Sequence, residues 1–505
     1  MSSIGEAGEV SLDVVGDPLG GAGDRNRAAA RMGVVTLLSR GSGAVRMVVV
    51  AAVLGTTYLG NTYQTANSIP NLVFELIAAG ALGAVLVPVL VAASDSDRGD
   101  EAASAVLGVT TALLVALSLV GMLVAPVVAH LLFAAVPDPS IRSDAVALGT
   151  LLLWCFLPQI AFYGLNMVAT ATLHTRGRFS LPAFAPFVNN VVVVATYAVF
   201  SWMRGGAEPT LDLSAPEVLL LGLGTTLGVV AFCVLPYVGA RRAGVNLHLR
   251  WQPRHPAVRR VVRQGGWAGG YLASGQVVLV AMLVLANSVE GGVVVQQLAY
   301  VLFLLPVSLL AVPVVTTAFP RLARDAERGA WGEYRREVMR AGRLVFAVST
   351  TAAVVLVVAR TPLAHLVTFG NASVATGEVA LAVAGFALGL PGFALALHLT
   401  RASYARHDTR SPTVVAAGCA LLAVVGMGAA ASWAAPSDRI AAMGVAHGAA
   451  WTVGAALLAL LLHQDLFRRG VLPPQMPNGE SDVIADRDGC AQRSHDVANR
   501  DGAER

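Results

Sequence analysis

Residues 61–90 have the sequence NTYQTANSIPNLVFELIAAGALGAVLVPVL. The stretch begins polar, passes through Pro70, and becomes an apolar run long enough to cross a bilayer. Its polar side chains recur three or four residues apart, which places them on one side of an α-helix: Gln64, Asn67, Asn71 and Glu75. A membrane helix with one polar stripe lines a wet space or pairs with polar groups inside a bundle. Glu75 is the only acidic residue that we place deep in an apolar segment.

The rest of the chain has the composition of a polytopic membrane protein. Of its 505 residues, 55% are hydrophobic and 13% are charged, and the mean hydropathy is +0.66. Soluble domains carry roughly a quarter charged residues. We predict about twelve apolar stretches near the spanning length, at 32–55, 68–92, 103–132, 145–172, 184–202, 217–240, 265–288, 293–319, 340–359, 376–400, 412–432 and 440–467. Their apolar runs are continuous rather than alternating, which excludes a β-barrel.

The basic residues give the predicted topology. All 35 are Arg, and the loops 241–263 and 321–343 hold seven each. The Arg-rich loops alternate with Arg-poor ones, so the positive-inside rule places them, and both termini, in the cytoplasm. The loop 93–101 fits less well, because it is predicted on the same side but carries a single Arg. The net charge of +4 therefore reflects the arginines of these loops and does not indicate nucleic-acid binding.

The chain divides into two similar halves at the Arg-rich break in hydropathy. In each half of six segments, the second segment runs between two prolines, Pro70 and Pro88 or Pro306 and Pro320. The fourth segment of each half enters a short basic loop. The predicted fold is all-α, with about twelve transmembrane helices in two six-helix lobes related by a parallel repeat, a layout typical of secondary transporters. The predicted divisions are a disordered tail 1–30, an N-lobe 31–241, a basic connector 242–264 that lies along the membrane interface, a C-lobe 265–469 and a disordered tail 470–505.

Two arginines lie in the first apolar segment. Insertion scales put the cost of each at about 2.5–3.5 kcal/mol. Arg40 and Arg46 are six residues apart, so a straight helix would point them in different directions. Gly41 and Gly43 between them allow a bend that would turn both toward one cavity. The alternative for Arg40 is that it snorkels to the cytoplasmic interface.

Catalytic chemistry has no signal in this sequence. There is no P-loop for direct use of ATP. The four cysteines are far apart, and the histidines have no metal-ligand spacing. We therefore predict a transporter without a cofactor or a metal site. Asn189 and Asn190, early in the fifth segment, are predicted to form helix–helix hydrogen bonds.

Three stretches resemble the MurJ (MviN) lipid II flippase family: SRGSGAVR at 39–46, GNTYQTANSIPNLVFELIAAGALGAVLVPVL at 60–90 and GRFSLPAFAPFVNN at 177–190. That family belongs to the multidrug, oligosaccharidyl-lipid and polysaccharide exporter superfamily. The resemblance runs over most of residues 32–468. It implies a V-shaped, MATE-like transporter of the bacterial cytoplasmic membrane that moves a lipid-linked peptidoglycan precursor outward by alternating access.

The chain departs from the family at several charged positions. Where family members have charged residues along the second and eighth helices and beside the first-helix Arg, this chain has Asn61, Phe74, Glu75, Ala79, Tyr300, Val301 and Met47. Many members also have two further helices. The sequence therefore leaves three alternatives open: a flippase for another lipid-linked saccharide, a non-transporting scaffold of cell-wall synthesis, and a small-molecule antiporter.

The resemblance and the stripe together give the predicted substrate site. Arg40 and Arg46 would attract the diphosphate, because the planar guanidinium fork matches phosphate. The polar headgroup would pass along Gln64, Asn67, Asn71 and Glu75, with Glu75 partly neutralising Arg46. The predicted partners are the lipid-linked saccharide, membrane lipids and proteins of cell-wall synthesis or division.

Overall fold

The computed structural model describes residues 22–77, 99–244, 248, 250–254 and 266–470, and within these the secondary structure is helical throughout. The first half of the chain contains α1 (Ala22–Leu54), α2 (Tyr58–Ile77), α4 (Gly99–Leu132), α5 (Pro139–Phe156), α6 (Gln159–Thr175), α7 (Ser180–Arg204) and α8 (Ala215–Arg242). The second half contains α10 (Gly266–Ala286), α11 (Gly292–Pro306), a π-turn η3 (Val307–Ala311), α12 (Val312–Glu327), α13 (Trp331–Val358), α14 (Arg360–Val367), a 3₁₀ turn η4 (Gly370–Ala375), α15 (Thr376–Ala387), α16 (Leu390–Ala405), α17 (Arg410–Trp433) and α18 (Arg439–Arg468).

Many of these helices are membrane-spanning by length and composition. Eight in the described part of the chain pass that test, and a ninth span is formed if the pair 370–387 and 390–405, bent by 43°, crosses as one. Every predicted apolar stretch overlaps a described helix, but the predicted count of twelve is not confirmed by this criterion. The second half of the stretch 68–92 lies outside the described residues, and α10 is apolar but short.

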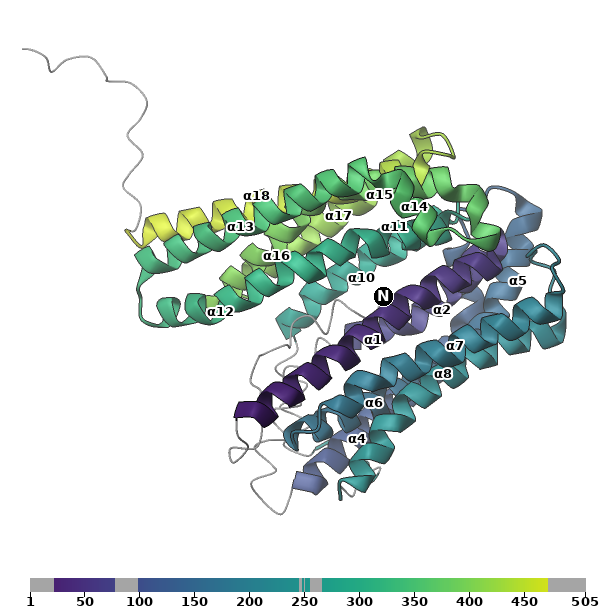
Figure 1. Ribbon diagram of the computed structural model, residues 1–505, viewed down its shortest axis with the longest axis horizontal. Coiled ribbons are helices and arrows are strands. Elements are labelled where there is room, and N and C mark those ends of the chain that lie inside the picture. The colour runs from purple at the N-terminus through teal and green to yellow at the C-terminus, as the bar shows by residue number, and fades with distance from the viewer. Residues whose placement is uncertain (1–21, 78–98, 245–247, 249, 255–265, 471–505) are drawn as a thin grey trace, which may run out of the picture.

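The helices form two groups, α1–α8 and α10–α18 (Figure 1). The core of the first group is built around buried aromatic and aliphatic side chains such as Phe156 and Phe200. The core of the second contains Phe303, Phe386 and Met443. Each group therefore buries its own apolar surface, as two packed lobes do.

The two groups meet at one end. In Figure 1 they approach each other near the end of α1 and spread apart toward α12 and α4. Gly291 precedes α11 with a φ of 70°, and a Cβ there would lie 2.4 Å from the carbonyl oxygen of Thr56. Only glycine permits both that backbone conformation and that close approach. The lobes are thus brought into backbone contact just outside α1.

The predicted bend in the first helix is wrong. Helix α1 is continuous from Ala22 to Leu54, through Gly41 and Gly43. It begins within the stretch predicted as a tail, while the boundaries of the lobes remain predictions. The helix is held to α7 by Asn190, whose Nδ2 donates to Ser42 Oγ at 2.9 Å. This confirms the predicted helix–helix bond for Asn190, whereas Asn189 Oδ1 is buried and has no hydrogen-bond partner among the described residues.

Candidate functional site

The polar stripe lies on α2 as predicted. All four residues fall within Tyr58–Ile77, which runs through Pro70 as one helix. Gln64 is buried, with its Nε2 3.4 Å from Met47 Sδ of α1. Asn67 is half-buried, and its carbonyl oxygen accepts a hydrogen bond from Asn71 Nδ2 at 3.1 Å. The beginning of the stripe is therefore largely satisfied inside the bundle.

Asn71 turns toward the first helix group. Its Oδ1 accepts a hydrogen bond of 2.6 Å from the hydroxyl of Tyr163 on α6. The ring of Tyr163 stacks on Phe74 with 4.6 Å between the ring centroids. Contacts of this kind fix the rotamers of all three side chains. Asn71 thus forms part of a rigid wall of the N-terminal lobe.

Glu75, one turn further on, reaches the other group. Its Oε2 accepts a hydrogen bond of 2.8 Å from Gln276 Nε2 on α10. Gln276 Oε1 is buried without a partner in the described structure. Glu75 also lies within electrostatic range of Tyr300 on α11. An amide donor compensates a buried carboxylate only in part, so this contact is a polar junction between the lobes.

The two arginines of α1 are separate from each other and from Glu75. Six residues rotate a helix by roughly 240°, so the unbroken α1 points them apart. Arg40 is exposed, and Arg46 is half-buried within electrostatic range of Tyr63, Tyr163 and Tyr197.

The predicted pairing of Arg46 with Glu75 is wrong. Among the described residues no ion pair joins them. The carboxylate of Glu75 instead accepts its hydrogen bond from Gln276 on α10, although Tyr163 lies within electrostatic range of both Glu75 and Arg46.

A set of buried amides between the lobes was missed. Asn61 is fully buried; its Nδ2 donates to Val289 O at 2.8 Å, and its Oδ1 accepts from Val293 N at 2.9 Å. Asn287 is also fully buried, and its Nδ2 lies 3.1 Å from Thr65 Oγ1. Gln297 Nε2 lies 3.4 Å from Ser68 Oγ. The available signal was the presence of single amides in otherwise apolar segments, which marks helix–helix contacts.

The side chains of α1 and α2 are suited to binding a ligand and not to catalysis. Within the described residues no group of three or more His, Cys, Asp or Glu side chains is placed to hold a metal ion. What α1 and α2 offer is a series of amides and hydroxyls with one carboxylate and two arginines. Such a surface can bind and guide a polar, negatively charged headgroup.

Comparison with known proteins places the chain in a family. Residues 50–472 match the family described as "Lipid II flippase MurJ". The chain belongs to the MurJ family. The lipid II flippase MurJ of Burkholderia cenocepacia is 28% identical over 459 residues, which are 89% of this chain and 85% of that protein. These matches confirm the predicted family and the predicted class of multi-pass membrane transporter.

Solved structures give the same fold. A lipid II flippase MurJ in an inward closed conformation has a TM-score of 0.70 and 18% identity, covering 87% of this chain and 90% of that one. An inward-facing MATE-family multidrug transporter of the MOP superfamily has a TM-score of 0.68 and 13% identity, with coverage of 86% and 95%. At these identities the likeness concerns the fold, and it confirms the MATE-like, all-helical architecture.

Proposed function

We propose that this protein flips a lipid-linked peptidoglycan precursor, lipid II, from the inner to the outer leaflet by alternating access. The observation that carries the proposal is the MurJ family match over residues 50–472. The arrangement of the two helix groups, joined near the ends of α1 and α10, supports it.

The junction is suited to opening and closing. The amide contacts of Asn61, Asn287 and Gln297 are neutral hydrogen bonds between the lobes. A neutral hydrogen bond contributes a net of only about 1 kcal/mol, because water replaces it when the groups separate. A few such bonds hold a closed end without locking it. The lobes can therefore exchange which end is closed.

The arginine distribution supports an orientation. The start of α10, which follows the Arg-rich segment 241–263 in the sequence, and the turn between α12 and α13, within the Arg-rich segment 321–343, lie at the opposite ends of their helices from the contacts of Asn61 and Asn287. If the Arg-rich loops are cytoplasmic, with both termini on that side, the closed end faces outward. The site would then be ready to admit a headgroup from the inner leaflet.

We assign the substrate contacts in steps along α1 and α2. Arg40, exposed and nearer the start of α1, would meet the diphosphate first. Arg46, about 9 Å further along the helix axis, would hold it deeper in the protein. The headgroup would pass Glu75, Asn71, Asn67 and Gln64 on α2. The lipid tail would stay in the bilayer, so no fully enclosed path is required.

The direct experiment is depletion in the native host, followed by identification of the lipid-linked intermediate that accumulates in the inner leaflet. Accumulation of lipid II supports the proposal. A different lipid-linked glycan would identify a flippase for another saccharide. If no intermediate accumulates and cell-wall enzymes are displaced, the result favours the scaffold. Partners among cell-wall proteins remain a prediction.

Variants separate the substrate path from general effects of charge. Arg46→Gln should abolish complementation and lipid II binding, and Arg40→Gln should weaken both. Arg335→Gln changes an exposed arginine of α13 that lies outside the proposed path, so it is the matched control and should complement fully. Full complementation by Arg46→Gln would remove this residue from the substrate site.

A further inference from the structure

The chain builds the same helix–helix corner twice, once in each lobe. The first corner joins α6 to α7, and the second joins α16 to α17. In the first, Arg178 N donates to Leu173 O at 2.9 Å; in the second, Asp408 N donates to Ser403 O at 3.1 Å. The residue before each donor has a positive φ, 69° at Gly177 and 61° at His407. By this backbone pattern Arg178 and Asp408 are equivalent positions.

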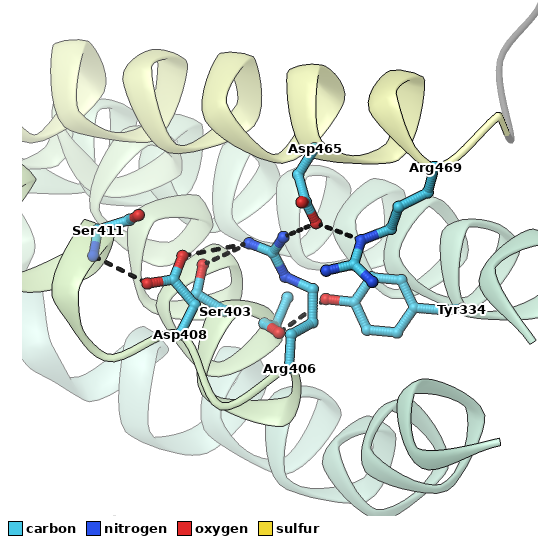
Figure 2. Close-up of polar contacts among 8 residues, drawn as sticks. Tyr334, Ser403, Arg406, Asp408, Ser411, Asp465 and Arg469 are labelled. Carbon is cyan, nitrogen blue, oxygen red and sulfur yellow. Dashed lines mark hydrogen bonds and ion pairs between the residues drawn. The ribbon is translucent and has the colours of Figure 1, made fainter. Parts of the chain in front are cut away.

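The C-terminal corner neutralises its own charge (Figure 2). The side chain of Arg406 is 5% exposed and lies between the carboxylates of Asp408, at 3.6 Å, and Asp465 of α18. Asp465 also accepts a hydrogen bond of 2.9 Å from Arg469 Nε. The guanidinium of Arg469 lies 3.9 Å from the ring centroid of Trp331. Arg406 and Arg469 therefore both have partners from the chain itself.

The N-terminal corner lacks both of those carboxylates. Arg178 occupies the position of Asp408. Counting three residues back from the ends of α8 and α18, Gly239 occupies the position of Asp465. The substitutions replace two negative charges with one positive charge and an absent side chain. The same fold element is thus left with a surplus of arginine.

Leu181 fills the place that a side chain at Gly239 would take, and Gly239 is one of the residues lining an open pocket of about 400 Å³. Arg178 and Arg242 line it together with Ser180, and Leu173, Phe179 and Leu181 supply apolar walls. Among the residues that the structure describes, no acidic side chain lines the pocket, and neither Arg178 nor Arg242 forms an ion pair. Arg176 adds a third cation nearby, with its Nη1 donating to Ala243 O at 2.8 Å.

We propose that this pocket binds the phosphate of an anionic phospholipid headgroup. Two guanidinium groups on one pocket match the geometry and charge of a phosphodiester. Pockets that hold small ligands have volumes of about 300–1,000 Å³, and this one falls in that range. The apolar walls suit the glycerol backbone and the first carbons of the chains, at the ends of membrane helices. The inference goes beyond lipid flipping and does not depend on it.

The test measures lipid binding to the full-length protein in a non-ionic detergent by native mass spectrometry. The probe is short-chain phosphatidylglycerol, and diacylglycerol with the same chains is the comparison without a phosphate. We expect saturable binding of phosphatidylglycerol and none of diacylglycerol at this site. Glycerol 3-phosphate, added as a competitor, distinguishes a lipid site from a site for free phosphate esters. Displacement at equal concentration would identify the soluble source.

The variants separate this pocket from the general charge of the surface. Arg178→Gln with Arg242→Gln should raise the Kd for phosphatidylglycerol about tenfold or more. The charge-matched control, Arg335→Gln with Arg340→Gln on exposed α13 positions, should change it less than about twofold.

A third variant tests whether loss of lipid binding is due to misfolding. Arg178→Asp installs the carboxylate of the C-terminal corner beside Arg176, so it should fold with unchanged or raised Tm and still lose the lipid. Equal affinity in wild type and in both pocket variants, or an equal loss in the control pair, would overturn the proposal.

Discussion

Replacing Asn61 with leucine should open the end at which the lobes meet. The change keeps the size of the side chain and removes both hydrogen bonds to the segment 289–293. In the closed state it leaves Val289 O and Val293 N buried without partners. In the open state water can satisfy these groups. Asn61→Leu therefore penalises one conformation only, whatever it does to overall stability.

The magnitude follows from the cost of each orphaned group. A buried backbone group without a partner costs about 1–3 kcal/mol, so two groups cost at least about 2 kcal/mol. Since about 1.4 kcal/mol is a factor of ten, the ratio of closed to open molecules should fall about 30-fold or more. Asn371 provides a matched control, because its Nδ2 also bridges the lobes, donating to Val53 O at 3.0 Å, but at an exposed position. Water can replace that bond, and Asn371→Leu should shift the ratio less than about threefold.

Double electron–electron resonance measures the distances between two spin labels, and the distribution of those distances reports the closed and open populations directly. Spin labels at Ser143 and Val374, both exposed, report the separation of α5 and η4 at the closed end. Asn61→Leu should enlarge the population at long distance, and Asn371→Leu should not. Identical distance distributions for Asn61→Leu and wild type would refute the role of Asn61 in closure, and equal shifts in the two variants would show that burial does not decide the effect.

Three further outcomes follow from the structure. Arg406→Ala should lower the free energy of unfolding by about 2 kcal/mol, measured as a lower Tm. The loss is smaller than the about 3–5 kcal/mol typical of breaking a fully buried pair, because the side chain of Asp465 is 32% exposed. Gln276→Leu should lower the Tm by removing the amide donor of Glu75, and adding Glu75→Leu should recover part of that loss; additive losses would mean that the contact contributes nothing. A cysteine at 330 should resist an impermeant thiol reagent in intact cells and one at 208 should react, whereas the reverse labelling would invert the topology.

The features that depend on residue periodicity and charge could be predicted from the sequence. The spacing of the stripe placed Gln64, Asn67, Asn71 and Glu75 on one helix, and the structure has them all on α2. Periodicity does not say which neighbour each residue meets. Glu75 contacts Gln276, 201 residues away, and that choice depends on how two separately packed lobes dock. For the same reason the partner proposed for Arg46 was wrong.

The bend expected in α1 failed for a different reason. Glycine permits a bend but does not require one, and packing decides the outcome. Here Gly43 lies beside α7, where a Cβ would be 3.6 Å from Asn190 Nδ2. The small residue serves close packing of two helices, with the Ser42–Asn190 hydrogen bond at the same contact. A straight α1 then follows, and with it the separation of its two arginines.

Helix α2 carries both the closing contact of Asn61 and the proposed substrate contact of Glu75. Asn61 near its start holds the closed end, and Glu75 near its other end lies at the junction with α10. Fourteen residues of helix separate them, a length of about 21 Å. The helix is continuous through Pro70, which removes one backbone hydrogen bond between the two contacts, so α2 carries both contacts on one element with a weak point between them. If the headgroup displaces Gln276 from Glu75, as proposed above, we expect the packing of α2 against α10 and α11 to change, where the amides of the closed end lie. This is how binding at one end of α2 would bias the junction at the other.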